Sequence, residues 1–96
     1  MNIDFNKNDG AMTVRLEGRL DTTTSPEFEG FLSSNLAGVE ALTIDCADLQ
    51  YVSSAGLRVL LSSQKKMNGK MKLINVCELV MEVFEMTGFA DILVIE

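Results

Sequence analysis

The chain has 96 residues and a mass of 10.5 kDa, a length that predicts one domain spanning residues 1–96. Apolar residues make up 47% of the chain, enough for a hydrophobic core, so it does not belong to the disordered class. Fourteen acidic and eight basic residues give a net charge of −6. A general nucleic-acid-binding protein is normally basic, so direct binding to nucleic acid is not expected. The sequence has no histidine, the commonest general base and metal ligand, so no catalytic residue, metal or cofactor is predicted.

The sequence contains no evident membrane-spanning or export segment. No window approaches the ~20 apolar residues of a membrane-spanning helix. Residues 1–7 alternate between polar and apolar types, unlike a signal peptide. The two cysteines, Cys46 and Cys77, lie in apolar stretches rather than in a C-x-x-C motif. They could form one disulfide, but we favour two buried, reduced thiols. We therefore expect a soluble cytoplasmic protein with no membrane partner.

The first two elements are predicted to form a β-hairpin. Residues 2–7 alternate, with Ile3 and Phe5 on the same side, as expected of a short strand. Asn8-Asp9-Gly10 is typical of a tight hairpin turn. The second strand, residues 11–17, has one apolar side, formed by Met12, Val14 and Leu16.

A helix is predicted to begin at the Ser25-Pro26 step. Ser25 is expected to cap the helix and Pro26 to occupy its first position. The apolar residues that follow recur every three or four positions, which predicts a buried stripe, and Gly38 is a plausible end. Residues 41–46 are mostly apolar and predict an interior strand. The buried stripe of the helix consists of Phe28, Phe31, Leu32 and Leu36.

Strands and helices continue to alternate after residue 46. A second helix follows Ser53-Ser54-Ala55-Gly56, with Leu57, Leu60, Leu61 and Gln64 on one face, and ends at Asn68-Gly69. Residues 71–76 form the next strand. A third helix follows, in which Leu79, Val80, Val83 and Phe84 are apolar and Gly88 marks the end, and Ile92–Ile95 form a last strand. The order β-β-α-β-α-β-α-β predicts an α/β fold with a mixed sheet, in which a hairpin precedes alternating helices and strands.

Residues 49–61 are the segment most indicative of function, because they form a strand–turn–helix junction with two hydroxyls at the turn. Functional sites in parallel sheets gather where strands end and helices begin. The simpler interpretation is that Ser53 or Ser54 caps the helix. A cap needs only one serine, however, and the small residues Ala55 and Gly56 leave the first-turn N–H groups uncovered. A phosphate on Ser54 would meet these donors at the positive end of the helix.

Enzyme chemistry is poorly supported. Ser54 has no histidine base and no Gly-x-Ser-x-Gly sequence around it. Asp21, Asp45 and Asp48 lie near strand ends, where solvated carboxylates are ordinary. The phosphate-binding P-loop pattern is absent as well.

The basic residues are concentrated in one part of the chain, between residues 58 and 72, which contains no acidic residue. Lys65 and Lys66 would close the second helix, where cations oppose the negative end of the helix dipole. The alternative is a docking patch for an acidic partner. The basic residues are Arg58, Lys65, Lys66, Lys70 and Lys72.

Several segments resemble the STAS domain of anti-sigma factor antagonists. The likeness covers nearly the whole chain in order and spacing. Its most specific part is the strand–hydroxyl–small–Gly–Leu junction, preceded by a Leu-x-Gly-x-Leu-Asp stretch. The segments are Leu16–Asp21, Leu42–Asp45, Tyr51–Leu57, Leu73–Val76 and Phe84–Phe89.

The resemblance implies a switch without catalytic activity. In such proteins the unmodified antagonist binds an anti-sigma factor that is also a serine kinase, which frees the sigma factor. Phosphorylation of the antagonist ends the binding, and a serine phosphatase reverses it. Ser54 matches the phosphoacceptor, two positions before Gly56, and Asp21 matches the acidic residue that lies near the acceptor. Ser53 stands where many members carry Asp. This departure implies either a change in kinase recognition or modification of Ser53 itself, which makes Ser53 the alternative acceptor.

The resemblance also implies a partner-binding surface and leaves other functions open. A stand-alone STAS scaffold, or a subunit of a stress-signalling or lipid-transport complex, would carry the same junction. An enzyme or small-ligand binder is a third class, for which the sequence offers no phosphate-cradling glycine loop. The predicted partner-binding residues are Asp21, Thr22, Thr23, Ser53, Ser54, Ala55, Gly56, Leu57 and Arg58.

Overall fold

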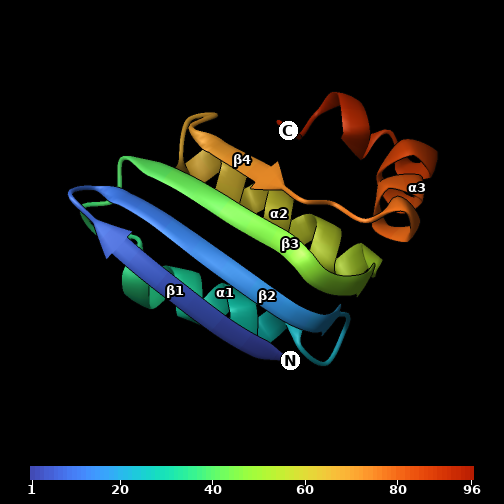
Figure 1. Cartoon of the computed structure of the whole chain (residues 1–96), viewed down its shortest axis with the longest axis horizontal. Coiled ribbons are helices and arrows are strands. Elements are labelled where there is room, and N and C mark those ends of the chain that lie inside the picture. Colours follow the sequence, from blue (N-terminus) through green and yellow to red (C-terminus); the bar gives the residue numbers. More distant parts are fainter.

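A computed structural model describes all residues from 1 to 96 and has a mixed four-stranded sheet with the strand order β1-β2-β3-β4 (Figure 1). β1 is antiparallel to β2, whereas β2, β3 and β4 are parallel to one another. This arrangement confirms the predicted α/β class. The elements are β1 (Asn2–Asn8), β2 (Ala11–Leu20), α1 (Ser25–Asn35), β3 (Ala41–Val52), α2 (Ser54–Lys66), β4 (Met71–Ile74), α3 (Glu78–Thr87) and a short 3-10 helix (Phe89–Asp91).

The N-terminal hairpin forms as the sequence predicts. Asp9 and Gly10 have φ angles of 48° and 86°, the left-handed pair that a two-residue hairpin turn requires. The apolar side of β2 is buried under the helices. Phe5 of β1 stays 48% exposed, with its ring edge-on to Phe31 of α1 at a centroid distance of 5.1 Å.

β2 and β3 are both longer than predicted. In β3, two irregularities interrupt the alternation of polar and apolar residues by which a strand is recognised in the sequence. Arg15 pairs with Asp45 but Glu17 pairs with Asp48, so β3 contains one extra residue there. A second extra residue lies opposite the Gly18–Arg19 step. Each extra residue shifts the side-chain alternation by one position. The buried residues of β3 are therefore unevenly spaced, at Leu42, Ile44, Cys46, Leu49 and Val52.

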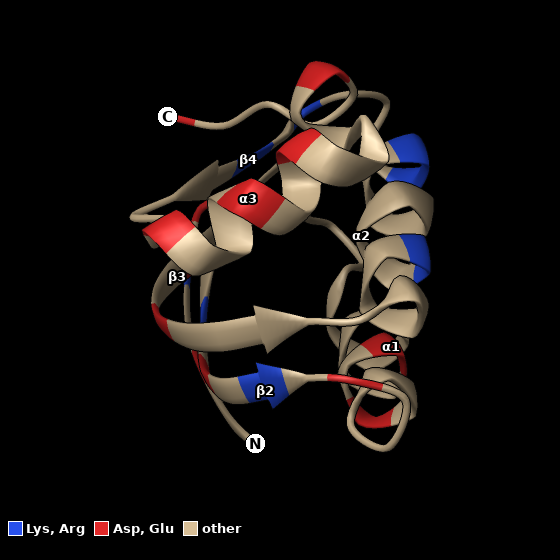
Figure 2. Ribbon diagram, turned by 90° about the vertical axis from the view of Figure 1, so that its right-hand side faces the viewer, with Lys and Arg blue, Asp and Glu red and all other residues tan.

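α1 and α2 lie side by side on one face of the sheet, and α3 packs against β3 near the end of the strands (Figures 1 and 2). The predicted stripe of α1 is buried at Phe28 and Leu32 and only half-buried at its other two positions. Leu79 of α3 is 56% exposed, so it does not join the core as predicted. The helices contribute to the core mainly through Phe28, Leu32, Leu57, Val59, Leu60, Val80 and Phe84.

Two predicted boundaries are wrong for identifiable reasons. Thr24, not Ser25, precedes the first turn of α1, and the Ser25 hydroxyl donates to the Asp21 carbonyl at 2.5 Å. The predicted strand Ile92–Ile95 is only a single bridge between Leu73 and Ile95. The backbone N–H groups of residues 92 and 93 donate to the Phe89 carbonyl instead, so that part of the chain completes the 3-10 turn.

Both cysteines are free thiols, but only Cys46 is buried as expected, whereas Cys77 is half-buried. β4 ends at Ile74, earlier than predicted, because Asn75 turns the chain with a φ of 57°. No helix in the structure combines the length and the apolar character needed to cross a membrane.

Candidate functional site

Ser53 joins β3 to α2 and acts as the cap of the helix. Its backbone is extended, and its Oγ accepts a hydrogen bond from the N–H of Gly56 at 3.4 Å. Its own N–H donates to the Leu20 carbonyl at 2.9 Å, and its carbonyl accepts from the N–H of Leu57 at 2.9 Å. Ser53 is therefore the serine that caps the helix, and its hydroxyl oxygen already accepts a hydrogen bond.

Ser54 is the first residue of α2 and is exposed. Its hydroxyl has no hydrogen-bond partner in the structure, in contrast to that of Ser53. The first N–H groups of a helix have no partner inside the helix. In α2 those of Gly56 and Leu57 are taken by Ser53, so the N–H groups of Ser54 and Ala55 are the ones left at this end. An anion attached to the Ser54 oxygen would find these donors and the positive end of the helix dipole close by.

Gly56 brings the start of α2 directly against the end of β2. A Cβ atom at this position would lie 2.8 Å from both the carbonyl oxygen and the Cγ of Leu20. Real Cβ atoms do not approach other atoms so closely. The absence of a side chain therefore lets the junction pack on Leu20, which places Ser54 next to the loop that begins at Asp21.

The loop between β2 and α1 is held by the Asp21 carboxylate. Its Oδ1 accepts hydrogen bonds from the N–H groups of Thr23 at 3.0 Å and Thr24 at 3.1 Å. These bonds, that of Thr24 foremost, lower the pKa of the Asp21 carboxyl from its ordinary value. Arg19 lies 3.8 Å from the same carboxylate and stacks over the ring of Tyr51, with its guanidinium carbon 4.3 Å from the ring centroid. Asp21 thus shapes the loop, and Thr22 and Thr23 are exposed upon it.

The structure brings the predicted site residues together at one end of the sheet, but not all of them face solvent. Ser54 and Arg58 are exposed, whereas Ala55 is half-buried. Gly56 is buried and Leu57 is only 4% exposed. The side chain of Leu57 therefore anchors α2 in the core, so a partner at this end of the sheet would meet mainly the exposed residues around it.

A groove of about 360 Å³ lies between the start of α1 and the outer face of α2. The groove residues of α1, and Val59 and Ser62 of α2, were not predicted as site residues. The spacing of four between Arg58 and Ser62 places both on one helix face and is the signal that could have indicated Ser62. No group of acidic or cysteine residues capable of holding a metal ion is present. The groove offers hydroxyls and one charge of each sign rather than an acid–base pair. It is lined by Thr22, Ser25, Pro26, Glu29, Ala55, Arg58, Val59 and Ser62.

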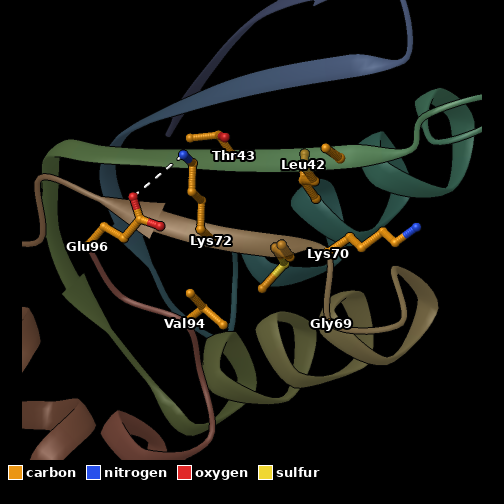
Figure 3. A pocket seen from close by; sticks show the side chains of 9 residues that line it. Leu42, Thr43, Gly69, Lys70, Lys72, Val94 and Glu96 are labelled. Atoms are coloured by element: carbon orange, nitrogen blue, oxygen red, sulfur yellow. Dashed lines mark ion pairs between the residues drawn. The ribbon is translucent and has the colours of Figure 1, made fainter.

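Another hollow, of about 330 Å³, lies at the opposite end of β3, where β3 begins (Figure 3). Gly69, Lys70 and Lys72 lie on its rim, and the Nζ of Lys72 is 3.6 Å from Oε1 of Glu96. None of the predicted site residues lines it. The two ends of the strand thus carry separate hollows, and only the one beside α1 adjoins Ser54.

Charge is segregated between helices. Figure 2 shows basic residues on α2 and acidic residues along α3. Arg58, Lys65 and Lys66 are exposed on α2. Lys70 and Lys72 lie beside the hollow at the start of β3. The exposed acids of α3 are Glu78, Glu82 and Glu85.

Comparison with known proteins identifies the family to which this fold belongs. The model of the STAS domain matches residues 2–96. The chain belongs to the STAS domain family. BtrV of Bordetella bronchiseptica is 33% identical over 96 residues, covering 96% of this chain and 83% of its own length. The anti-sigma-B factor antagonist of Bacillus subtilis strain 168 is 30% identical over 96 residues, covering 97% of this chain and 88% of the relative.

Solved STAS structures share the fold at low sequence identity. The anti-sigma factor antagonist SpoIIAA in its unphosphorylated form superimposes with a TM-score of 0.84 at 18% identity, covering 99% of this chain and 88% of SpoIIAA. The phosphorylated form of SpoIIAA from Bacillus gives a TM-score of 0.74 at 17% identity, covering 99% of this chain and 91% of that one. This STAS protein therefore shares its fold with a protein known in two modification states.

Proposed function

We propose that this STAS protein is an anti-sigma factor antagonist controlled by phosphorylation of Ser54. In its unmodified form it binds an anti-sigma factor with serine kinase activity, which releases a sigma factor. Phosphorylation ends the binding, and a serine phosphatase restores it. The names of the relatives support the antagonist function, and the phosphorylated form of SpoIIAA supports control by modification.

The observation that carries the proposal is the contrast between the two serines. Ser53 is committed to the cap of α2 and to the end of β2. Ser54 is exposed, and its hydroxyl is free for a kinase to reach. Of the two candidate acceptors, Ser54 is the one whose oxygen takes part in no hydrogen bond of the fold.

The expected partner surface combines the exposed residues of the loop after β2 with the exposed residues of α2. Thr22 and Thr23 lie on one side, and Ser54 and Arg58 on the other. Two of these residues, Thr22 and Arg58, line the groove between α1 and α2. A partner that covers this end of the sheet would enclose the Ser54 hydroxyl.

A phosphate on Ser54 would change binding more than it changes the fold. It adds a charge of about −1.5 to −2 at pH 7. Within the protein this charge lies at the favourable end of α2, so no backbone rearrangement is needed. In a partner surface shaped for a neutral hydroxyl, the same charge must be desolvated. A loss of ~3 kcal/mol would weaken binding more than a hundredfold.

Incubation with the anti-sigma factor kinase of the same organism and ATP tests the acceptor assignment directly. We expect mass spectrometry to find one phosphate on the wild type and on Ser53→Ala, and none on Ser54→Ala. Since the Ser54 hydroxyl makes no hydrogen bond, S54A should keep its fold and bind the kinase. Phosphate on Ser53, or unchanged phosphorylation of S54A, would refute the assignment.

A further inference from the structure

Arg58 is the one arginine of this chain without a partner. The guanidinium of Arg15 donates to Asp48, with Nε 3.0 Å from Oδ2. Arg19 is paired with Asp21 and stacked on Tyr51. Arg58 takes part in none of the three ion pairs, the cation–π contact or the side-chain hydrogen bonds of the structure. Its guanidinium is exposed and therefore free to take a new anionic partner.

The position of Arg58 on α2 puts its side chain within reach of Ser54. The two residues are four apart in the same helix, Ser54–Lys66. Side chains four apart on a helix are neighbours, with Cβ atoms about 5–6 Å apart. Long helical side chains also point back toward the N-terminus, which for Arg58 is the direction of Ser54. An anion that precedes a cation by four residues is the favourable order of the two charges.

We propose that Arg58 is the intramolecular counter-ion of phosphorylated Ser54. The inference rests on the proposed phosphorylation of Ser54 and adds which residue of the chain pairs with the phosphate. A phosphate monoester offers three acceptor oxygens, and the planar guanidinium donates two parallel N–H bonds to such a group. Lysine presents a single point charge instead, so arginine suits this position better.

The pairing alters the partner surface beyond Ser54 itself. In the unmodified protein, Arg58 and Glu29 both line the groove between α1 and α2. They do not form an ion pair. Once the guanidinium binds the phosphate, its positive charge moves from the groove to the start of α2. Phosphorylation then adds a negative charge and withdraws a positive one without moving the backbone.

Other charged groups near the start of α2 are already engaged or carry the wrong sign. Asp21 is held by the N–H groups of Thr23 and Thr24, and Arg19 is paired with that same carboxylate. Glu29 on α1 faces the groove and would repel a phosphate. Arg58 is therefore the only free cation among the charged residues that surround the Ser54 end of the groove.

The test uses protein in which phosphoserine is introduced at position 54 during synthesis, so that no kinase is needed. The phosphate is titrated by phosphorus NMR in the otherwise wild-type chain, in Arg58→Lys and in Arg58→Gln. Lys65→Gln removes one charge from the same helix, about 16 Å from Ser54 along the helix axis, and serves as the matched control. Thermal melting of each chain with and without the phosphate gives a second readout.

We expect the second ionisation of the phosphate to occur about half a pH unit lower in the wild type than in R58Q, because a nearby cation favours the dianion. R58K should lie between them, and K65Q should match the wild type. The gain in Tm on phosphorylation should be about 2 °C smaller in R58Q. Equal titration midpoints in the wild type and R58Q, or an equal shift in K65Q, would overturn the pairing. Neither result depends on whether a kinase modifies Ser54, so a failure of the proposed function remains distinguishable.

Discussion

Replacing Gly56 with alanine should destabilise the protein although alanine is the better helix former. The new Cβ atom would lie 2.8 Å from the carbonyl oxygen of Leu20. Restoring an ordinary contact requires α2 and β2 to separate by about 0.6 Å. That carbonyl also accepts the N–H of Ser53 at 2.9 Å, so the separation weakens the hydrogen bond that joins the two segments.

The expected size follows from three opposing effects. Overpacking a tight contact costs about 1–3 kcal/mol, and weakening the hydrogen bond to Leu20 adds up to about 1 kcal/mol. The higher helix propensity of alanine returns at most about 1 kcal/mol. The net loss is therefore about 2 kcal/mol of unfolding free energy, or a fall in Tm of about 10 °C for a domain of this size.

Gly30 offers the matched control for Gly56→Ala. It lies inside α1, is exposed, and a Cβ atom there would meet nothing within 4 Å. Gly30→Ala should therefore stabilise the protein by about 0.5–1 kcal/mol. Thermal and urea unfolding followed by circular dichroism measure both variants. If G56A is as stable as G30A, the close approach of α2 to Leu20 does not limit this position and the packing argument fails.

Three further predictions concern the site and the thiols. Ser53→Ala should lose about 1 kcal/mol of unfolding free energy in urea because it removes the cap of α2, whereas Ser54→Ala should change it by less than about 0.5 kcal/mol; the reverse order would contradict the assigned roles. The folded pKa of Asp21 is lowered, so its carboxylate stabilises the fold above the unfolded value near 4, and this contribution is lost as the pH falls through the folded value. Asp21→Asn should thus be less stable than the wild type at pH 7, with a gap that closes below pH 4 in unfolding experiments; a gap independent of pH would count against this role. Burial raises the pKa of the Cys46 thiol to about 12, so iodoacetamide at pH 8 should label the half-buried Cys77 first in peptide mapping, and equal labelling would contradict the burial of Cys46.

The alternation and helix-end signals predicted most elements because each depends on local chemistry. Asp9 and Gly10 adopt the left-handed turn that their types favour, and β2, β3 and β4 are parallel, as expected of strands joined by helices. The length of β3 could not be predicted, since its two extra residues interrupt the alternation on which strand prediction depends. The missing last strand has a similar origin, because the turn after Gly88 takes up the N–H groups that the strand would have used.

The roles of the two serines could be predicted only in part from the sequence. The residue types at the junction indicate a cap and an exposed hydroxyl, but only the structure assigns the cap to Ser53. The burial of Leu57 depends on how α2 packs against the sheet. Glu29 reaches the groove because α1 lies beside α2, an arrangement that no local pattern specifies.

The central claim is tested most directly by the affinity of this protein for the anti-sigma factor kinase of its own organism. Isothermal titration calorimetry compares the unmodified chain with the chain that carries phosphoserine at position 54, under the same salt conditions and with a non-hydrolysable ATP analogue. We expect the unmodified protein to bind and the phosphorylated protein to bind more than a hundredfold more weakly. Equal affinity of the two forms would contradict a switch at Ser54.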